Sequence, residues 1–124
     1  MMTLTNTRVF GIEKYGETLV VTPQGDSTEF RYAEIHQETN SICDLIARGE
    51  TIDLIIDLGQ VQILGSIIIS SIIKIARKIN EQRGDACFCQ AGSFMREVIH
   101  TMSLTKLWPY FDSLDDAIGS FDND

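Results

Sequence analysis

The stretch that decides the fold is TIDLIIDL at residues 51–58, followed by GQVQILGSIIIS at residues 59–70. The first eight residues are rich in β-branched and apolar side chains, which is typical of a central strand covered on both faces of a sheet. A turn then leads into a helix expected over residues 66–83, apolar at first and amphipathic later, with Gly84 ending it. A buried strand that runs through a turn into a long helix indicates a parallel α/β sheet.

The segments before this stretch predict two strands and a helix. Residues 8–14 and 18–22 have strand composition and are separated by Tyr-Gly-Glu, so they are expected to form a hairpin. Ile35, Thr39, Ile42 and Ile46 recur at helical spacing, and that helix should stop near Gly49.

The segments after it predict two strands that alternate with two helices. Strands are expected at residues 86–90 and 107–111, and a helix is expected to begin near Ser93. Ser113 and Asp116 suit the N-cap and first turn of a final helix. The whole order predicts one α/β domain over residues 1–124, with a mixed, mostly parallel sheet of about five strands and about four helices. Residues 1–6 and 122–124 are expected to be flexible ends.

Composition narrows the classes of function. The chain has 124 residues, and 10 Lys and Arg against 18 Asp and Glu give a net charge of -8, which disfavours direct contact with nucleic acid or anionic lipid. The most apolar stretch, residues 61–73, is too short for a membrane span, and the first residues lack the pattern of a signal peptide. Three cysteines are an odd number, which favours a reducing cytoplasm over a disulfide framework.

Candidate chemical groups are few. Neither of the common glycine-rich phosphate-binding motifs occurs, so no cofactor is predicted. Cys87 and Cys89 share one face of a strand, and Glu97 and His100 are one helical turn apart, but neither pair has the further ligands that a metal site needs. We therefore interpret both cysteines as buried residues that face a helix. The remaining candidates are interpreted as structural: His36 as a helical histidine, and Asp53 and Asp57 as carboxylates that bond to loop amides.

Ser66 has two interpretations. As an N-cap its hydroxyl would accept a hydrogen bond from a first-turn amide, which contributes about 1 kcal/mol. As a phosphate acceptor it would place about -1.5 to -2 charge at a helix N-terminus that can hold it. A partner covering Ile63, Leu64 and Ile67 would then have to desolvate a dianion, and it would be released.

These residues resemble the STAS family, whose fold is shared by anti-sigma factor antagonists and the cytoplasmic tails of sulphate transporters. The resemblance rests on IIDL at 55–58, Gly65-Ser66 and the helix after it, Gly84, MREVI at 95–99 and SLDDAI at 113–118. It implies a non-enzymatic module that binds an anti-sigma factor, which is also a serine kinase, and that lets go when Ser66 is phosphorylated. Leu64, Gly65, Ile67 and the Gly25-Asp26 loop would form the docking surface, beside Ser66.

The family motif is only partly present. Gly65 stands where the family usually has Asp, and Ile67 and Ile68 replace a small residue and a glycine. The alternative is therefore a constitutive STAS scaffold or oligomer subunit without a phosphorylation switch. A third hypothesis is a metal- or thiol-dependent enzyme using Cys87, Cys89 and His100. The sequence leaves the oligomeric state open.

Overall fold

The structure, a computed structural model, describes residues 7–25 and 29–121. The expected flexible ends, residues 1–6 and 122–124, lie outside this part. Five strands form one sheet in the order β1-β2-β3-β4-β5, in which β1 is antiparallel to β2 and every other neighbouring pair is parallel. The elements are β1 (Phe10–Tyr15), β2 (Thr18–Pro23), α1 (Tyr32–Ala47), β3 (Asp53–Asp57), α2 (Ser66–Glu81), β4 (Ala86–Cys89), α3 (Ser93–Thr101), the 3₁₀ turn η2 (Leu104–Lys106), β5 (Tyr110–Phe111) and α4 (Leu114–Phe121). The predicted α/β class and the number of strands are confirmed.

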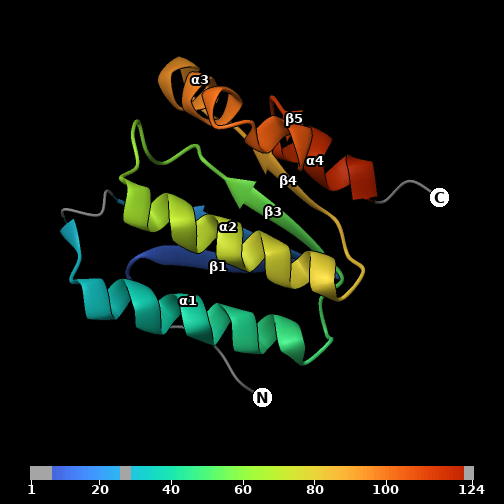
Figure 1. Cartoon of the computed structure of the whole chain (residues 1–124). Coiled ribbons are helices and arrows are strands. Elements are labelled where there is room, and N and C mark those ends of the chain that lie inside the picture. The colour runs from blue at the N-terminus through green and yellow to red at the C-terminus, as the bar shows by residue number, and fades with distance from the viewer. Residues whose placement is uncertain (1–6, 26–28, 122–124) are drawn as a thin grey trace.

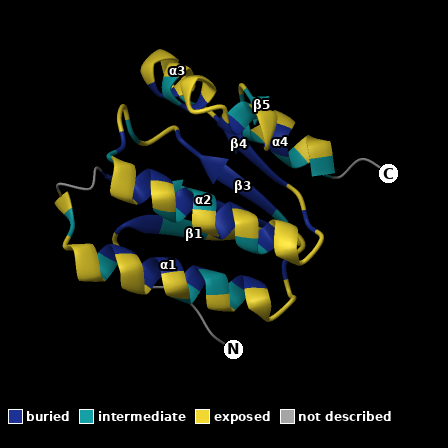
Figure 2. Ribbon diagram, viewed as in Figure 1, coloured by how far each residue is buried: buried dark blue, intermediate teal, exposed yellow. Residues whose placement is uncertain are grey.

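The helices cover the two faces of the sheet unequally. Figure 1 shows α1 and α2 lying side by side across one face, and α4 packs against β3, β4 and β5. The larger apolar cluster combines side chains of α1, α2 and α3 with the sheet, whereas the smaller one gathers around Ala117 of α4. In Figure 2 the strands β3 and β4 are buried along most of their length, while the helices alternate between buried and exposed residues.

Strand β3 is the centre of both clusters. Leu54 and Ile56 belong to the larger cluster, and Ile55 between them belongs to the smaller one. All three side chains are fully buried, and each contributes about 1.5–3 kcal/mol through burial of apolar surface. The prediction of a strand covered on both faces is confirmed.

Four of the five predicted strands are shorter in the structure. The central strand is Asp53–Asp57 instead of residues 51–58, and β4 ends at Cys89 instead of Gln90. The first begins at Phe10 rather than Arg8, and the amides of Arg8 and Val9 before it donate to the carboxylate of Glu38, at 2.7 and 3.0 Å. The last is only β5, because the amides of residues 106–108 donate to carbonyls three or four residues earlier and form a turn.

Helix α2 ends earlier than predicted, at Glu81 instead of Arg83. Arg83 rather than Gly84 adopts the left-handed conformation, with φ of 70°, and the amide of Gly84 donates to Ile79 O at 3.0 Å. Gly84 is needed for a different reason: a Cβ there would overlap the carbonyl oxygen of Ile52. In contrast, Gly49 has the left-handed backbone (φ 81°) expected after the first helix. Over the described residues, no helix is both long enough and apolar enough to cross a membrane.

Candidate functional site

Ser66 lies where a parallel sheet usually places its binding site. Strands β2 and β3 are neighbours and parallel, so the segment that follows β2 and the segment of residues 58–65 leave the same edge of the sheet. Figure 1 shows the start of α2 on the same side of the molecule as the start of α1. Ser66 is the first residue of α2 and is exposed.

The interpretation of Ser66 as the N-cap is wrong. Gly65 is the N-cap, with extended backbone (φ -75°, ψ 168°), and its carbonyl accepts the first intrahelical bond from the amide of Ile69 at 3.1 Å. The chain enters the helix one residue earlier than a serine cap would require, because glycine also tolerates the N-cap position. The hydroxyl of Ser66 therefore stands on the first turn.

The residues predicted to surround Ser66 divide into exposed and buried ones. Ile63 and Ile67 are 51% and 40% exposed and flank Ser66 in the sequence. Leu64 is only 5% exposed and belongs to the larger cluster, so its side chain anchors the loop instead of facing a partner.

On the neighbouring loop, Gly25 is buried, and a Cβ there would lie 2.7 Å from Glu29 Oε1, whereas Asp26 lies outside the described residues.

A hollow of about 610 Å³ opens beside this segment, toward the amino end of α3. Its lining includes Val61 and Ile63 from the loop and Gly92, Ser93 and Phe94 from the start of α3. Phe94 is 53% exposed and was missed by the sequence analysis. Its signal was its position next to Met95, which faces the core, so that Phe94 had to leave the buried face of the helix.

Asp57 fixes the start of the loop. Its carboxylate is buried at the end of β3 and accepts hydrogen bonds from the amide of Gly59 and from Gln90 Nε2, both at 2.9 Å. Gln90 Oε1 in turn accepts the amide of Leu114 at 3.4 Å, so the same side chain reaches the start of α4. The prediction that Asp57 bonds to a loop amide is confirmed.

Asp53, at the other end of β3, behaves in the same way. It accepts the amide of Asp85 at 3.2 Å, and burial raises its carboxyl pKa above the ordinary value. Asp53 and Asp57 thus bond to separate loops, and they do not form a pair that shares a proton.

The two cysteines of β4 are buried structural residues, as predicted. Both side chains are almost fully buried beside Ala117 of α4, and this burial raises the pKa of Cys87 and Cys89 to about 12. Such thiols are protonated at neutral pH and are poor nucleophiles and metal ligands.

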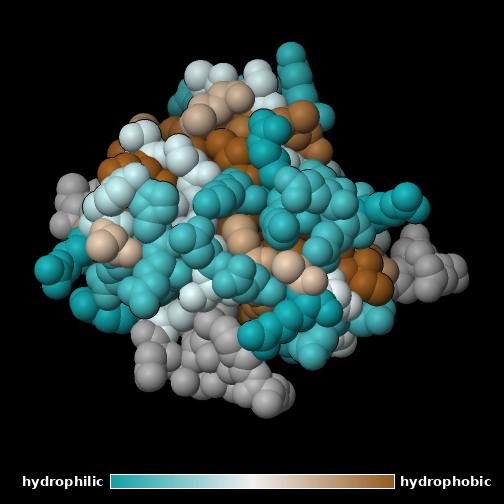
Figure 3. Space-filling model, turned by 60° about the horizontal axis from the view of Figure 1, so that its bottom comes forward, coloured by the Kyte–Doolittle hydropathy of each residue, from teal (hydrophilic) through white to brown (hydrophobic). Residues whose placement is uncertain are grey.

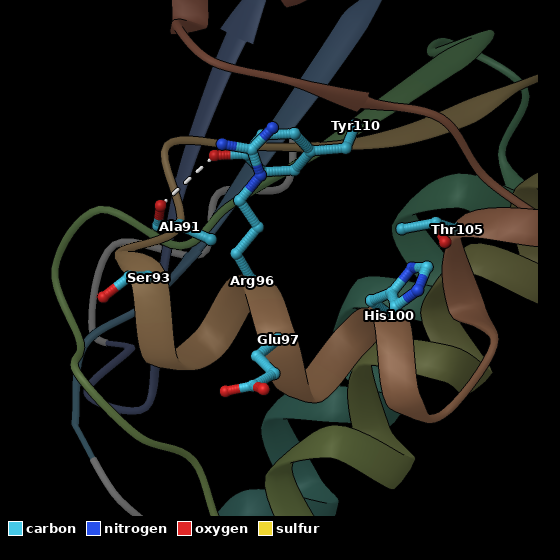
Figure 4. A pocket seen from close by; sticks show the side chains of 7 residues that line it. All are labelled: Ala91, Ser93, Arg96, Glu97, His100, Thr105 and Tyr110. Atoms are coloured by element: carbon cyan, nitrogen blue, oxygen red, sulfur yellow. Dashed lines mark hydrogen bonds between the residues drawn. The ribbon is translucent and has the colours of Figure 1, made fainter.

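Glu97 and His100 are also kept apart. They line a second hollow, of about 610 Å³, together with Arg96 and Tyr110. Figure 4 shows the carboxylate of Glu97 and the imidazole of His100 pointing in different directions, with His100 beside Thr105. The Arg96 guanidinium lies over the Tyr110 ring at 4.6 Å and pairs with Asp112 at 3.4 Å. Within residues 7–25 and 29–121, no three His, Cys, Asp or Glu side chains are grouped as a metal site would require.

Comparison with protein families settles the class of the domain. The family model of the STAS domain matches residues 10–117, which is most of the chain. The chain belongs to the STAS domain family. The strand, turn and helix around Ser66 are therefore the corresponding part of a STAS domain, as the resemblance of the sequence implied. A search of curated protein sequences gives no match.

Several solved structures share this STAS fold. The anti-sigma factor antagonist SpoIIAA in its unphosphorylated form superposes with a TM-score of 0.72 at 18% identity, over 93% of this chain and 99% of that one. The phosphorylated form of the Bacillus protein gives 0.70 at 18% identity, over 90% and 98% of the two chains. An anti-sigma factor antagonist from Mycobacterium paratuberculosis gives 0.73 at 24% identity, over 92% and 93%.

Proposed function

We propose that this STAS domain is a non-enzymatic signalling module of the anti-sigma factor antagonist type, which binds an anti-sigma factor with serine kinase activity and is switched by phosphorylation of Ser66. The observation that carries the proposal is the exposed hydroxyl of Ser66 on the first turn of α2, flanked by the exposed side chains of Ile63 and Ile67. Solved antagonists with the same fold, one of them in a phosphorylated form, support it.

The first turn of α2 can hold a phosphate without refolding. The first amides of a helix have no acceptor within the helix, and the helix dipole adds positive potential at this end. A phosphate on Ser66 would accept hydrogen bonds from these amides, so the domain itself would tolerate about -1.5 to -2 additional charge.

The partner would not tolerate that charge. We propose that it covers Ile63 and Ile67, with the backbone of Gly65 between them and Phe94 at the border of the surface. Leu64 is buried beneath this loop. We propose that Gly25 and Asp26 also contribute to partner binding. A bound partner would have to strip water from a dianion against apolar surface, so it dissociates. Release from nearly full to nearly empty occupancy requires about 5.5 kcal/mol of difference between the two states.

The same proposal includes the class of partner and the cell compartment. The net charge of -8 disfavours nucleic acid as a direct partner, so the module acts on transcription through proteins. Its buried free thiols suit the reducing cytoplasm.

Phosphosite mapping tests the switch, and α3 supplies a matched control. Ser93 also follows a glycine N-cap, is the first residue of its helix and is exposed. After incubation with ATP in an extract of the source cells, we expect phosphate on Ser66 that disappears in Ser66→Ala and persists in Ser93→Ala. Unphosphorylated protein should capture the kinase from the extract, and purified phosphoprotein should not.

A constitutive scaffold is the second candidate, favoured by Gly65 in the place of the usual aspartate. An unmodified Ser66 in a protein that still captures partners would favour the scaffold over the switch.

A further inference from the structure

The exposed face of α2 changes character along its length. Its first exposed residues are uncharged (Ser66, Ile67 and Ser70), and the next are Lys74 and Arg77. No acidic residue occurs on α2 before Glu81, although the chain as a whole carries a net charge of -8. Lys74 and Arg77 therefore form a basic strip on the surface of a protein that is acidic as a whole.

A groove runs beside this face, between α1 and α2. It encloses about 210 Å³, and none of its lining side chains is acidic. Ile67 and Tyr32 contribute apolar surface, Ser70 and Ser71 contribute hydroxyls, and His36 and Lys74 contribute nitrogen donors. In Figure 3, which brings the α1 side of the molecule forward, the surface is mostly hydrophilic, and apolar groups gather in separate patches.

The polar groups of the groove are held in place. His36 Nε2 lies 2.6 Å from the hydroxyl of Tyr32, and Lys74 Nζ donates to Asn40 Oδ1 at 3.1 Å, which bridges the two helices. Glu81 pairs with Lys78 at 3.7 Å. Among the described residues, Lys74 and Arg77 take part in no ion pair.

We propose that the α1–α2 groove and the basic strip bind an acidic segment of the partner protein, in which Asp or Glu side chains approach Lys74 and Arg77. The inference rests on the proposed docking at Ser66, because Ile67 belongs both to that surface and to the groove and makes the two continuous. Charge complementarity identifies the occupant: the groove offers ammonium, imidazole and hydroxyl groups and no carboxylate that would repel an acid.

This arrangement would strengthen the switch. Ser66 and Ser70 are about 6 Å apart along the helix axis, at about 1.5 Å per residue, whereas Ser66 and Lys74 are about 12 Å apart. The Debye length at physiological salt is about 8 Å, so salt screens the repulsion between a phosphate on Ser66 and a carboxylate at Lys74. The phosphate would therefore repel chiefly the part of the acidic segment that passes Ile67 and Ser70, in addition to the cost of desolvating the phosphate itself.

Selection from a random peptide library tests the proposal without knowledge of the natural partner. Short peptides displayed on phage are selected on the immobilised full chain, and enriched peptides are synthesised with a fluorescent label. We expect them to carry Asp and Glu beside apolar residues, and we expect their affinity to fall as NaCl is raised from about 0.05 M to about 0.3 M. Anisotropy titration gives the Kd for each variant.

Two double variants with equal net charge separate a local effect from a general one. Lys74→Gln/Arg77→Gln removes the strip, and Lys14→Gln/Lys106→Gln removes two exposed lysines from β1 and η2. The first should weaken peptide binding about tenfold, as expected for the loss of two ion pairs, and the second by less than about twofold.

Three outcomes would overturn the proposal: the enriched peptides lack carboxylates, no peptide is enriched, or both double variants lose affinity equally. The assay uses no kinase and no extract, so its failure would leave phosphorylation of Ser66 standing. Conversely, an unmodified Ser66 would leave the peptide result standing.

Discussion

Glu38 is the buried carboxylate on which the start of β1 depends. It lies on α1, is 9% exposed, and accepts the backbone amides of Arg8, Val9 and Phe10 at 2.7, 3.0 and 3.1 Å. These three amides belong to the edge of the sheet and have a charged acceptor in place of another strand. Bonds to a charged group are among the stronger hydrogen bonds in proteins.

Glu38→Gln should therefore destabilise the domain by about 1–3 kcal/mol, because the amide nitrogen cannot accept the bonds and leaves buried donors unpaired. Urea denaturation followed by fluorescence of Trp108 measures the change. Glu34→Gln is the control, since Glu34 forms an ion pair with the exposed side chain of Arg8 and accepts none of these backbone amides; this substitution should cost less than about 1 kcal/mol. Equal effects of the two substitutions would show that the amides of β1 do not depend on Glu38.

At the scale of the element, the three later helices begin in two different ways. Helix α4 begins after Ser113, whose hydroxyl accepts the amide of Asp116 at 3.0 Å, as the sequence predicted. Helices α2 and α3 begin after Gly65 and Gly92, and their serines follow the cap. A serine near a helix start can thus stabilise the helix or stay available for another function.

This difference predicts that alanine substitution of the two serines has different effects on stability. Ser113→Ala should cost about 1 kcal/mol, because it removes a capping bond from the helix that covers the smaller cluster. Ser66→Ala should change stability by less than about 0.5 kcal/mol, as for other exposed positions. The midpoints of thermal and urea unfolding compare the variants with the wild type. A large loss of stability in Ser66→Ala would mean that the Ser66 hydroxyl has a structural role.

The end of α2 gives a second prediction at this scale. Gly84→Ala should destabilise by about 3 kcal/mol or more, because the added Cβ overlaps the backbone of Ile52 and neither chain can move easily. Arg83→Gly, at the neighbouring left-handed position, should stay within about 1 kcal/mol of the wild type, since relief of backbone strain offsets the flexibility of glycine. If both substitutions had the same effect, the close approach to Ile52 would not be the cause.

At the scale of the whole molecule, burial of two thiols between β4 and α4 should make the domain less stable as the pH becomes alkaline. Unfolded cysteines ionise near pH 8.5, whereas burial raises the pKa of Cys87 and Cys89 to about 12. Above about pH 8.5 the unfolded state therefore binds fewer protons than the folded state, and stability falls as pH rises.

The free energy of unfolding should drop by up to about 1.4 kcal/mol per pH unit for each of the two thiols between about pH 9 and pH 10. Urea denaturation across this range measures the slope. Cys87→Ala/Cys89→Ala, which keeps Cys43, should lose most of the slope even though its stability at neutral pH is lower. A slope that persists in this variant would have to come from other groups.

The sequence by itself determined the class and order of the molecule. The strand composition of residues 51–58, the spacing of Ile35, Ile42 and Ile46, and the cap at Ser113 are local signals that act over a few residues, and each was confirmed. Hydrophobic patterning predicts such elements because it records which face of each segment is buried.

Only the tertiary structure decided which groups meet. Asp57 and Gln90 lie 33 positions apart, and the groove combines side chains from two helices separated by a strand. The burial of Leu64, the exposure of Phe94 and the start of α2 after Gly65 depend on neighbours brought by the fold. Sequence patterns could place Ser66 near the start of a helix, but its surroundings follow from packing, which acts between residues that are distant along the chain.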